Sequence, residues 1–324
     1  MGATYAVAGL TIEARCEDPT VAAMVEARLS ALRGDPSDRA APADITIEIS
    51  GPGSPTPRLV APTGSGRPMY DGPDQAIDYF EQDDQLFADF AGHVVLQCAP
   101  AAGLIRIAVA SSDPSDRVVA AHPLLTVALH ETVKRFGRFP LHAAALALGG
   151  RGVLVPGTSG AGKSTLTVTL VRAGFDFLSD DTVFLTPEDD GILVSGFPDE
   201  IDVADGTIAM FDELAPLAGA PLALGREKRG FRVEDVFGVS PRASCRPAVL
   251  VFPRVEEGPS PYLEALSPAE ALIELMPNVL VTEPRSTQAH MDMLGDLVRA
   301  VPGYRFRPGP DVDAAAACIA TLVS

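Results

Sequence analysis

One eight-residue segment limits the fold of this chain more than any other part. It reads Gly157-Thr158-Ser159-Gly160-Ala161-Gly162-Lys163-Ser164. Its glycines allow backbone conformations that a side chain would hinder, so consecutive N–H groups can turn toward one anion. An apolar run, Val153 to Val155, precedes the segment, and a helical pattern follows it as far as Ala173, with Gly174 as its stop. A strand, a glycine-rich turn and a helix in this order predict a phosphate-binding loop.

The residues of this loop have separate expected roles. Lys163 is expected to reach the β- and γ-phosphates of a nucleoside triphosphate, and the Ser164 hydroxyl to ligate Mg²⁺. The helix that begins at Lys163 directs the positive end of its dipole at the same anion. We therefore predict an ATP site with Mg²⁺, although such a loop recognises phosphates and not the base. The predicted ATP-binding residues are Gly157, Thr158, Ser159, Gly160, Ala161, Gly162, Lys163, Ser164 and Thr165.

Two carboxylates follow the next apolar run, in Phe177-Leu178-Ser179-Asp180-Asp181. A strand of this kind brings an acid to the carboxyl edge of a sheet, beside the phosphate loop. One carboxylate can hold Mg²⁺ with its water shell, and the other can take the proton from an attacking hydroxyl. The sequence itself leaves open which of Asp180 and Asp181 has which role.

The composition of the chain argues against some classes of binding partner. The net charge of -18 and the pI of about 4.6 argue against nucleic acid and anionic membrane surfaces. The segment Met1 to Thr11 lacks a secretory pattern, and no stretch is apolar enough to span a membrane. The cysteines have neither metal-ligand nor redox spacing, so we expect reduced thiols and a cytoplasmic protein. They are Cys16, Cys98, Cys245 and Cys318.

At 324 residues the chain has room for two domains. We expect a smaller α+β domain over residues 1–122 and an α/β domain over 123–324, with the boundary at a helix from about Pro123 to Phe136 that Gly137 ends. In the first part, Thr4 to Arg15 is predicted as one strand and Ile45 to Ile49 as a half-buried strand. In the second, Ser267-Pro268-Ala269-Glu270 predicts a capped helix start, and a final helix is expected to start near Asp311.

The segment from Leu141-His142-Ala143 through the glycine loop to Asp180-Asp181 resembles the catalytic domain of HPr kinase/phosphorylase and its relatives. The spacing between Lys163 and Asp180, short for phosphate-loop proteins, is similar to that family's. The resemblance implies the phosphoenolpyruvate-carboxykinase-like variant of the P-loop kinase fold. It also implies that Ser164 and Asp180 organise Mg²⁺, that Asp181 is the general base, and that His142 lies near the transferred phosphoryl group.

Basic residues gather in one place in this acidic, lysine-poor chain: Lys228, Arg229 and Arg232. Such a cluster can clamp the developing charge of a transferred phosphate. It can equally neutralise acids on an exposed loop. The sequence leaves both interpretations open.

The main functional hypothesis is an ATP-dependent kinase that phosphorylates a hydroxyl, of a protein or peptide Ser/Thr or of a small molecule such as a free amino acid. The alternatives are a P-loop ATPase and a non-catalytic nucleotide-binding module. The sequence has neither the signature nor the distant acidic strand of transporter ATPases, and mere binding needs no base. The Arg- and Gly-rich segment of the bifunctional kinases has no counterpart here, so the resemblance does not extend to reverse phosphorolysis or hexamers. The sequence leaves open whether the protein forms a homo-oligomer.

Overall fold

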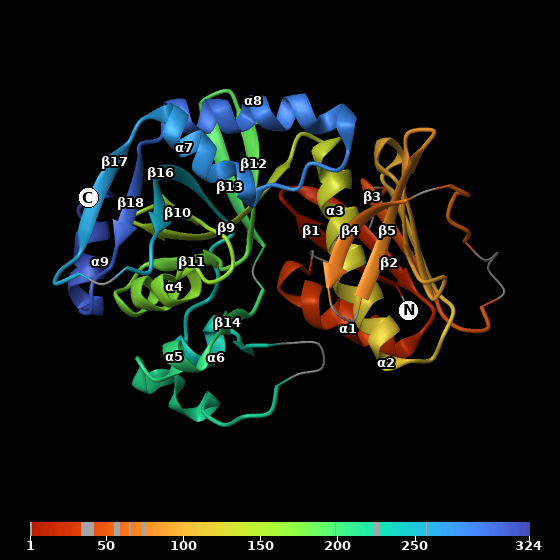
Figure 1. Ribbon diagram of the computed structural model, residues 1–324, viewed down its shortest axis with the longest axis horizontal. Helices are drawn as coiled ribbons and strands as arrows, with labels where there is room; N and C mark the ends of the chain where they lie inside the picture. The colour runs from red at the N-terminus through yellow and green to blue at the C-terminus, as the bar shows by residue number, and fades with distance from the viewer. Residues whose placement is uncertain are drawn as a thin grey trace. The chain divides into compact units, whose positions relative to one another are not determined.

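The computed structural model describes residues 2–33, 42–54, 59–64, 66–72, 75–197, 199–222, 227–256 and 258–324. The chain divides into two compact units, Met1–Gly137 and Arg138–Ser324 (Figure 1). The helix expected to open the second domain therefore lies in the first unit. It packs on strands of that unit through the apolar stripe of Leu125, Leu129 and Val133, which are all buried.

The first unit is an eight-stranded sheet in the order β1-β2-β3-β8-β7-β6-β5-β4, with helices packed on it. Ile45, Ile47 and Ile49 are buried, and the alternation predicted for this half-buried strand is confirmed. The strands are β1 (Gly2–Val7), β2 (Leu10–Cys16), β3 (Ile45–Ser50), β4 (Arg67–Gly72), β5 (Gln75–Gln82), β6 (Gln85–Phe90), β7 (Val94–Ala99) and β8 (Leu104–Val109). The helices are α1 (Pro19–Leu29), α2 (Pro114–Val119) and α3 (Leu125–Lys134).

One strand prediction for the first unit is wrong, and one predicted helix, present as α3, continues a helical run that begins earlier than expected. Residues 4–15 do not form one strand, because Ala8 and Gly9 both have positive φ and make the tight turn of a β1–β2 hairpin. The helix expected from Pro123 begins earlier, at Pro114, where the Asp113 side chain caps it. Pro123 lies inside a π-helical turn, Ala120–Leu124, that joins α2 to α3, since proline has no N–H to continue the ordinary helical ladder.

The second unit is a mixed α/β structure in which two long strands, β9 and β16, each take part in two sheets. The strands are β9 (Phe139–Leu148), β10 (Arg151–Pro156), β11 (Asp176–Ser179), β12 (Thr182–Glu188), β13 (Gly191–Phe197), β14 (Ile201–Val203), β15 (Arg229–Phe231), β16 (Ser244–Pro253), β17 (Tyr262–Leu266) and β18 (Gly303–Arg307). The helices are α4 (Lys163–Arg172), α5 (Asp205–Ile208), α6 (Val233–Phe237), α7 (Pro268–Leu275), α8 (Pro284–Ala300) and α9 (Val312–Ala320).

The pairing of β10 positions the site. Along one side β10 pairs with β9 in antiparallel register, and along the other it pairs with β16 in parallel register. Strand β18 continues the parallel arrangement beside β16, and β11 pairs with the edge of β9 that faces away from β10. The carboxyl ends of β10, β16 and β18 therefore meet at one edge of the sheet, which is where ligands bind in open α/β sheets.

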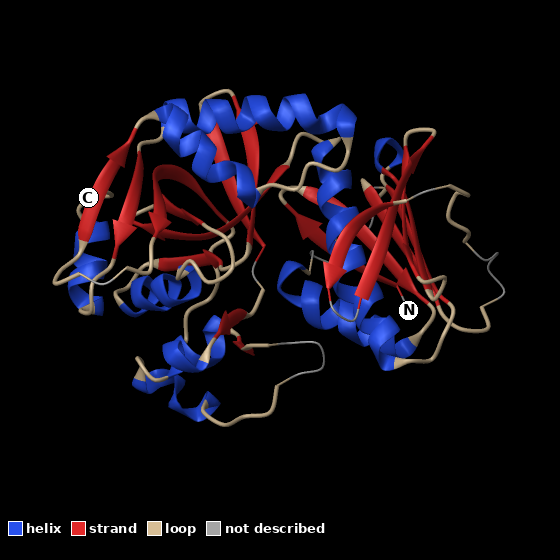
Figure 2. Ribbon diagram, viewed as in Figure 1, coloured by secondary structure: helices blue, strands red, loops and turns tan. Residues whose placement is uncertain are grey.

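Helices cover both faces of these strands, as Figure 2 shows with α7 and α8 on one side and α4 and α9 on the other. Residues of β10 alternate between two cores: Val153 and Val155 pack with α4 and α9, whereas Leu154 packs with α7 and α8. Both faces of β10 are thus buried, which explains its continuous apolar run.

Two helix starts in the second unit match the sequence prediction. Ser267 and Glu270 form the reciprocal capping box at the start of α7, and the Asp311 side chain caps α9. In the described part of the chain, no helix is both long and apolar enough to cross a bilayer.

Candidate functional site

The glycine-rich loop, residues 157–164, connects the buried strand β10 to helix α4. Gly160 and Gly162 have φ of +83° and +95°, a region that L side chains rarely adopt. A Cβ on Gly157 would come within 3.1 Å of the Ala161 Cβ, so the loop is also tight at its start. Gly162 is the N-cap of α4 and has no side chain to cap the first helical N–H groups. These N–H groups are available to an anion.

Lys163 lies largely buried across the loop. Its Nζ donates to the Gly157 carbonyl at 2.6 Å and lies 3.0 Å from Nε2 of His142. Burial lowers the pKa of this ammonium, and the nearby carboxylates of Asp180 and Asp181 oppose the change. The ammonium is therefore held close to the loop and close to both acids.

Asp180 is buried at the end of β11, and its Oδ2 accepts a hydrogen bond of 2.7 Å from the Ser164 hydroxyl. Its Oδ1 is buried and makes no hydrogen bond within the described residues. Burial raises the pKa of Asp180 to about 7, an effect that the nearby hydroxyls of Thr167 and Ser164 offset only in part. The charge of the nearby Lys163 ammonium also opposes this rise in pKa, without cancelling it.

Asp181, in contrast, has a side chain that is 53% exposed. Its Oδ1 lies 3.1 Å from Nδ1 of His142. The register explains this contact: Thr182 at the start of β12 is paired with His142 on β9, so the preceding residue comes beside the imidazole. His142 thus lies between Asp181 on one ring nitrogen and Lys163 on the other.

These residues fit a Mg²⁺ ion that is shared with a phosphate ligand. The orphaned Oδ1 of Asp180 and the hydroxyl of Ser164 are hard oxygen donors of the kind that Mg²⁺ prefers. Among the described residues no group of three or more His, Cys, Asp or Glu side chains could hold a metal alone. Mg²⁺ typically binds one or two protein oxygens together with water and substrate phosphates, which this donor set matches.

The basic cluster divides into two kinds of environment. Arg229 donates to the Ala220 carbonyl and pairs with Asp205, and Arg232 pairs with Glu234 at 3.4 Å. Lys228 is near enough to Lys163 for its charge to help lower the pKa of that lysine. The two arginines thus neutralise acids, whereas the charge of Lys228 acts on Lys163.

Thr165 makes a contact that the sequence does not predict. Its hydroxyl lies 2.8 Å from that of Thr207 on α5, a residue for which no motif gives a signal. The Thr165 side chain is therefore directed to α5. Thr207 thereby connects the β14–α6 segment to the first turn of α4.

Several known proteins are similar to this chain. HPr kinase/phosphorylase of Geobacillus sp. (strain WCH70) is 39% identical to it over 62 residues, 19% of this chain and 20% of the relative. The Bacillus cereus (strain B4264) and Bacillus anthracis (strain A0248) proteins of the same name match to the same extent. The matched region spans about a fifth of the length of these relatives. No family model matches the chain.

Among solved structures, the Hpr(Ser) kinase/phosphatase of Coxiella burnetii is similar with 17% identity and a TM-score of 0.32, over 57% of this chain and 87% of that one. The similarity in sequence to the curated relatives is the more specific of the two findings. The resemblance to the HPr kinase family is confirmed: over 62 residues this chain is similar in sequence to HPr kinase/phosphorylases.

Proposed function

We propose that this protein is an ATP-dependent kinase that transfers the γ-phosphate to a hydroxyl, of a Ser or Thr residue in a protein or peptide. Its second unit would be a P-loop kinase core of the phosphoenolpyruvate-carboxykinase-like type, and its first unit a docking domain. The glycine-rich loop between a buried parallel strand and a helix supports the nucleotide site.

One observation carries the proposal: the two adjacent aspartates have opposite environments. Asp180 is buried and bound to the loop serine, whereas Asp181 is exposed and beside His142. A metal ligand should be fixed and shielded, and a general base should be open to an acceptor that arrives from solvent. This contrast favours Asp180 with Ser164 as the metal-holding pair and Asp181 as the base.

The residues of the chain then act in a defined order. Backbone N–H groups of the loop bind the phosphates, and Lys163 turns from the Gly157 carbonyl to the terminal phosphate oxygens. Asp181 accepts the proton of the acceptor hydroxyl while His142 holds this carboxylate in place. When bound, Mg²⁺ supplies neutralisation of the phosphate charge beside Asp180 and Ser164.

Lys228 is the best candidate for a phosphate clamp in the basic cluster. Its charge acts on Lys163, whereas Arg229 and Arg232 are each paired with a carboxylate. A second cation near the transferred group would stabilise negative charge that develops there.

The name of the curated relatives supports a protein acceptor, since they are HPr kinases. The exposure of Asp181 is consistent with an acceptor as large as a loop of another protein. A free amino acid could reach the same carboxylate. For this reason the acceptor assay needs both classes.

The proposal is tested with radiolabelled ATP, Mg²⁺ and three acceptors in parallel: Ser/Thr-containing peptides, free serine and water alone. A kinase transfers label to an acceptor, and Asp181→Asn should abolish this transfer while nucleotide binding persists. Free phosphate without labelled acceptor would identify an ATPase instead. ATP that binds and stays intact under every condition would identify a binding module and refute the kinase.

A further inference from the structure

The glycine-rich loop has two sides, and the acids occupy only one. β9, which carries His142, pairs with one edge of β10, and β11, which the two aspartates follow, lies beyond β9. The other edge of β10 pairs with β16. A triphosphate whose terminal phosphate faces the acids must therefore extend its α-phosphate and nucleoside away from them. The strand on that side is β16.

An exposed apolar side chain stands at the end of β16. Residues 249–253 are buried, but Val255, which follows shortly after, is 75% exposed, the largest exposed fraction among the large apolar side chains in the described part of the second unit. It lies against the loop: a Cβ on Gly162 would be only 3.3 Å from the Val255 Cγ2. A large apolar group beside a phosphate cradle is suited to a ligand with an apolar part.

The turn that presents Val255 is fixed on both sides. The Glu256 N–H donates to the Arg254 carbonyl at 3.0 Å, which makes a tight turn around Val255, and the Arg254 N–H donates to the Phe306 carbonyl of β18 at 2.8 Å. The backbone around Val255 is thus fixed, while its side chain is largely exposed.

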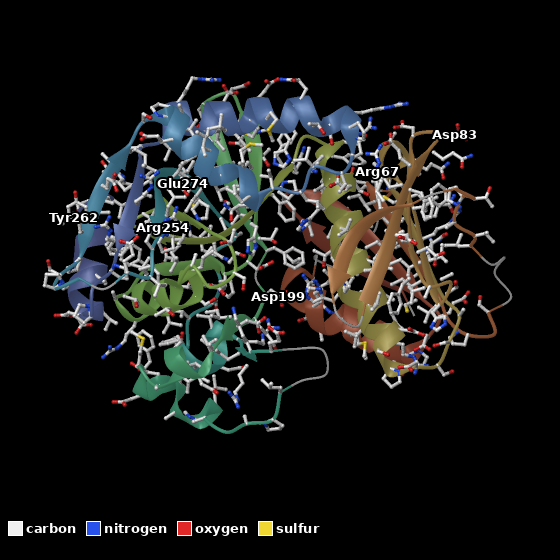
Figure 3. All side chains as sticks on the ribbon, in the orientation of Figure 1. Arg67, Asp83, Asp199, Arg254, Tyr262 and Glu274 are labelled. Atoms are coloured by element: carbon white, nitrogen blue, oxygen red, sulfur yellow. The ribbon has the colours of Figure 1, made fainter. Side chains whose placement is uncertain are left out.

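Side chains reinforce the same turn. The Arg254 guanidinium pairs with Glu274 of α7, and Glu256 pairs with Arg307 at 2.8 Å. Arg307 also lies over the ring of Tyr262, 5.4 Å from its centroid. Figure 3 shows Arg254, Glu274 and Tyr262 in one region of the second unit. The charged side chains around this turn each take part in an ion pair. The exposed side chain of Val255 is therefore the group of the turn that is available to a ligand.

We propose that Val255 is the contact for the nucleoside part of the nucleotide, against which the base or ribose packs when the phosphates lie in the loop. This inference rests on the proposed function, because it needs a nucleoside triphosphate in the loop. It assigns to Val255 the ability to distinguish a nucleotide from an inorganic polyphosphate. An apolar contact responds to the presence of a nucleoside more than to which base it carries.

The test compares two ligands in calorimetric titrations with Mg²⁺: the β,γ-imido analogue of ATP and inorganic tripolyphosphate. Val255→Ser should weaken the ATP analogue about fivefold to tenfold, as expected for loss of one buried valine contact. The affinity for tripolyphosphate should not change. Val255→Leu keeps an apolar group and should keep the wild-type affinity for both ligands.

Val60→Ser is the matched control, because Val60 is a comparably exposed valine (72%) in the first unit. It should leave both affinities unchanged. Equal weakening of both ligands by Val255→Ser would assign the valine to the shape of the loop and overturn the inference. Unchanged affinities would overturn it too. If the wild-type protein bound neither ligand, both the phosphate-loop assignment and the kinase proposal would be refuted. If the protein bound both ligands whatever the residue at position 255, only the inference about Val255 would be refuted.

Discussion

Replacing Asp180 with asparagine should make the metal-free protein more stable above neutral pH. Burial raises the pKa of this carboxyl to about 7 from 3.8, so at pH 8 the native state holds a buried negative charge. A pKa difference of this size corresponds to at most about 4 kcal/mol of unfolding free energy. Asparagine removes the charge but leaves part of its amide without a partner, at a cost of about 1–3 kcal/mol. We expect a net gain of about 1–3 kcal/mol.

The pH dependence has a definite sign. The pKa of Asp180 is higher in the native state than in the unfolded chain, so the native state binds the extra proton between about pH 4 and pH 7. The stability that this proton contributes is therefore lost as the pH rises through that window. All other groups are shared by the two proteins, so the difference between them isolates Asp180. The advantage of asparagine should be smaller at pH 5 than at pH 8 by about 2–3 kcal/mol.

Differential scanning calorimetry in the presence of EDTA measures the effect. For a unit of this size 1 kcal/mol corresponds to about 2–4 °C, so Asp180→Asn should melt about 3–10 °C above wild type at pH 8. With Mg²⁺ and ATP the order should reverse, because only wild type gains stability from the ligand. An asparagine variant that is less stable at pH 8, or equally favoured at both pH values, would refute the assignment of Asp180 as a buried, uncompensated carboxylate.

Three further variants test the remaining residues. Lys163→Ala should weaken binding of Mg²⁺-ATP about tenfold to a hundredfold by calorimetry, because a charge-assisted contact to phosphate is lost; unchanged affinity would contradict the loop assignment. Asp181→Asn should slow phosphate transfer by about 10²–10⁴ without changing ATP affinity, and activity close to wild type would place the base elsewhere. Lys228→Ala should lower kcat/KM about tenfold, whereas Arg232→Ala should have little effect, because Arg232 is paired with Glu234. Equal losses in these last two variants would argue against a clamp at Lys228.

Local features of the fold could be predicted because their signals are local. The glycines of the loop, the capping box at Ser267 and the cap at Asp311 each involve residues a few positions apart, and the structure has the loop turn and both helix starts where the sequence indicates. The Ala8–Gly9 hairpin was missed because only the glycine of the pair is a usual turn residue, while Ala8 adopts positive φ as well.

The sheet of the second unit could not be derived in the same way. β9 is apolar at nearly every position, so no alternation shows which residues face α4 and which face α7 and α8. Strand β10 pairs with β9 along one edge and with β16 along the other, and β16 comes much later in the chain. Strand order of this kind is decided by which pairing buries both faces, and that depends on all the elements together. The position of Val255 beside the loop depends on this strand order, so it could not be predicted from the sequence.

The hydrogen-bond partners of His142 could not be predicted from the sequence. The resemblance placed it near the phosphoryl group, but the geometry also constrains its proton. A lysine ammonium can only donate, so Nε2, which lies 3.0 Å from the Lys163 Nζ, must accept. In the neutral imidazole the proton is then on Nδ1 and is directed at Asp181, 3.1 Å away. When Lys163 turns toward a phosphate, Nε2 loses its donor, while the bond that orients Asp181 can remain. Nucleotide binding would thus release one side of His142 and leave the base aligned for the acceptor hydroxyl.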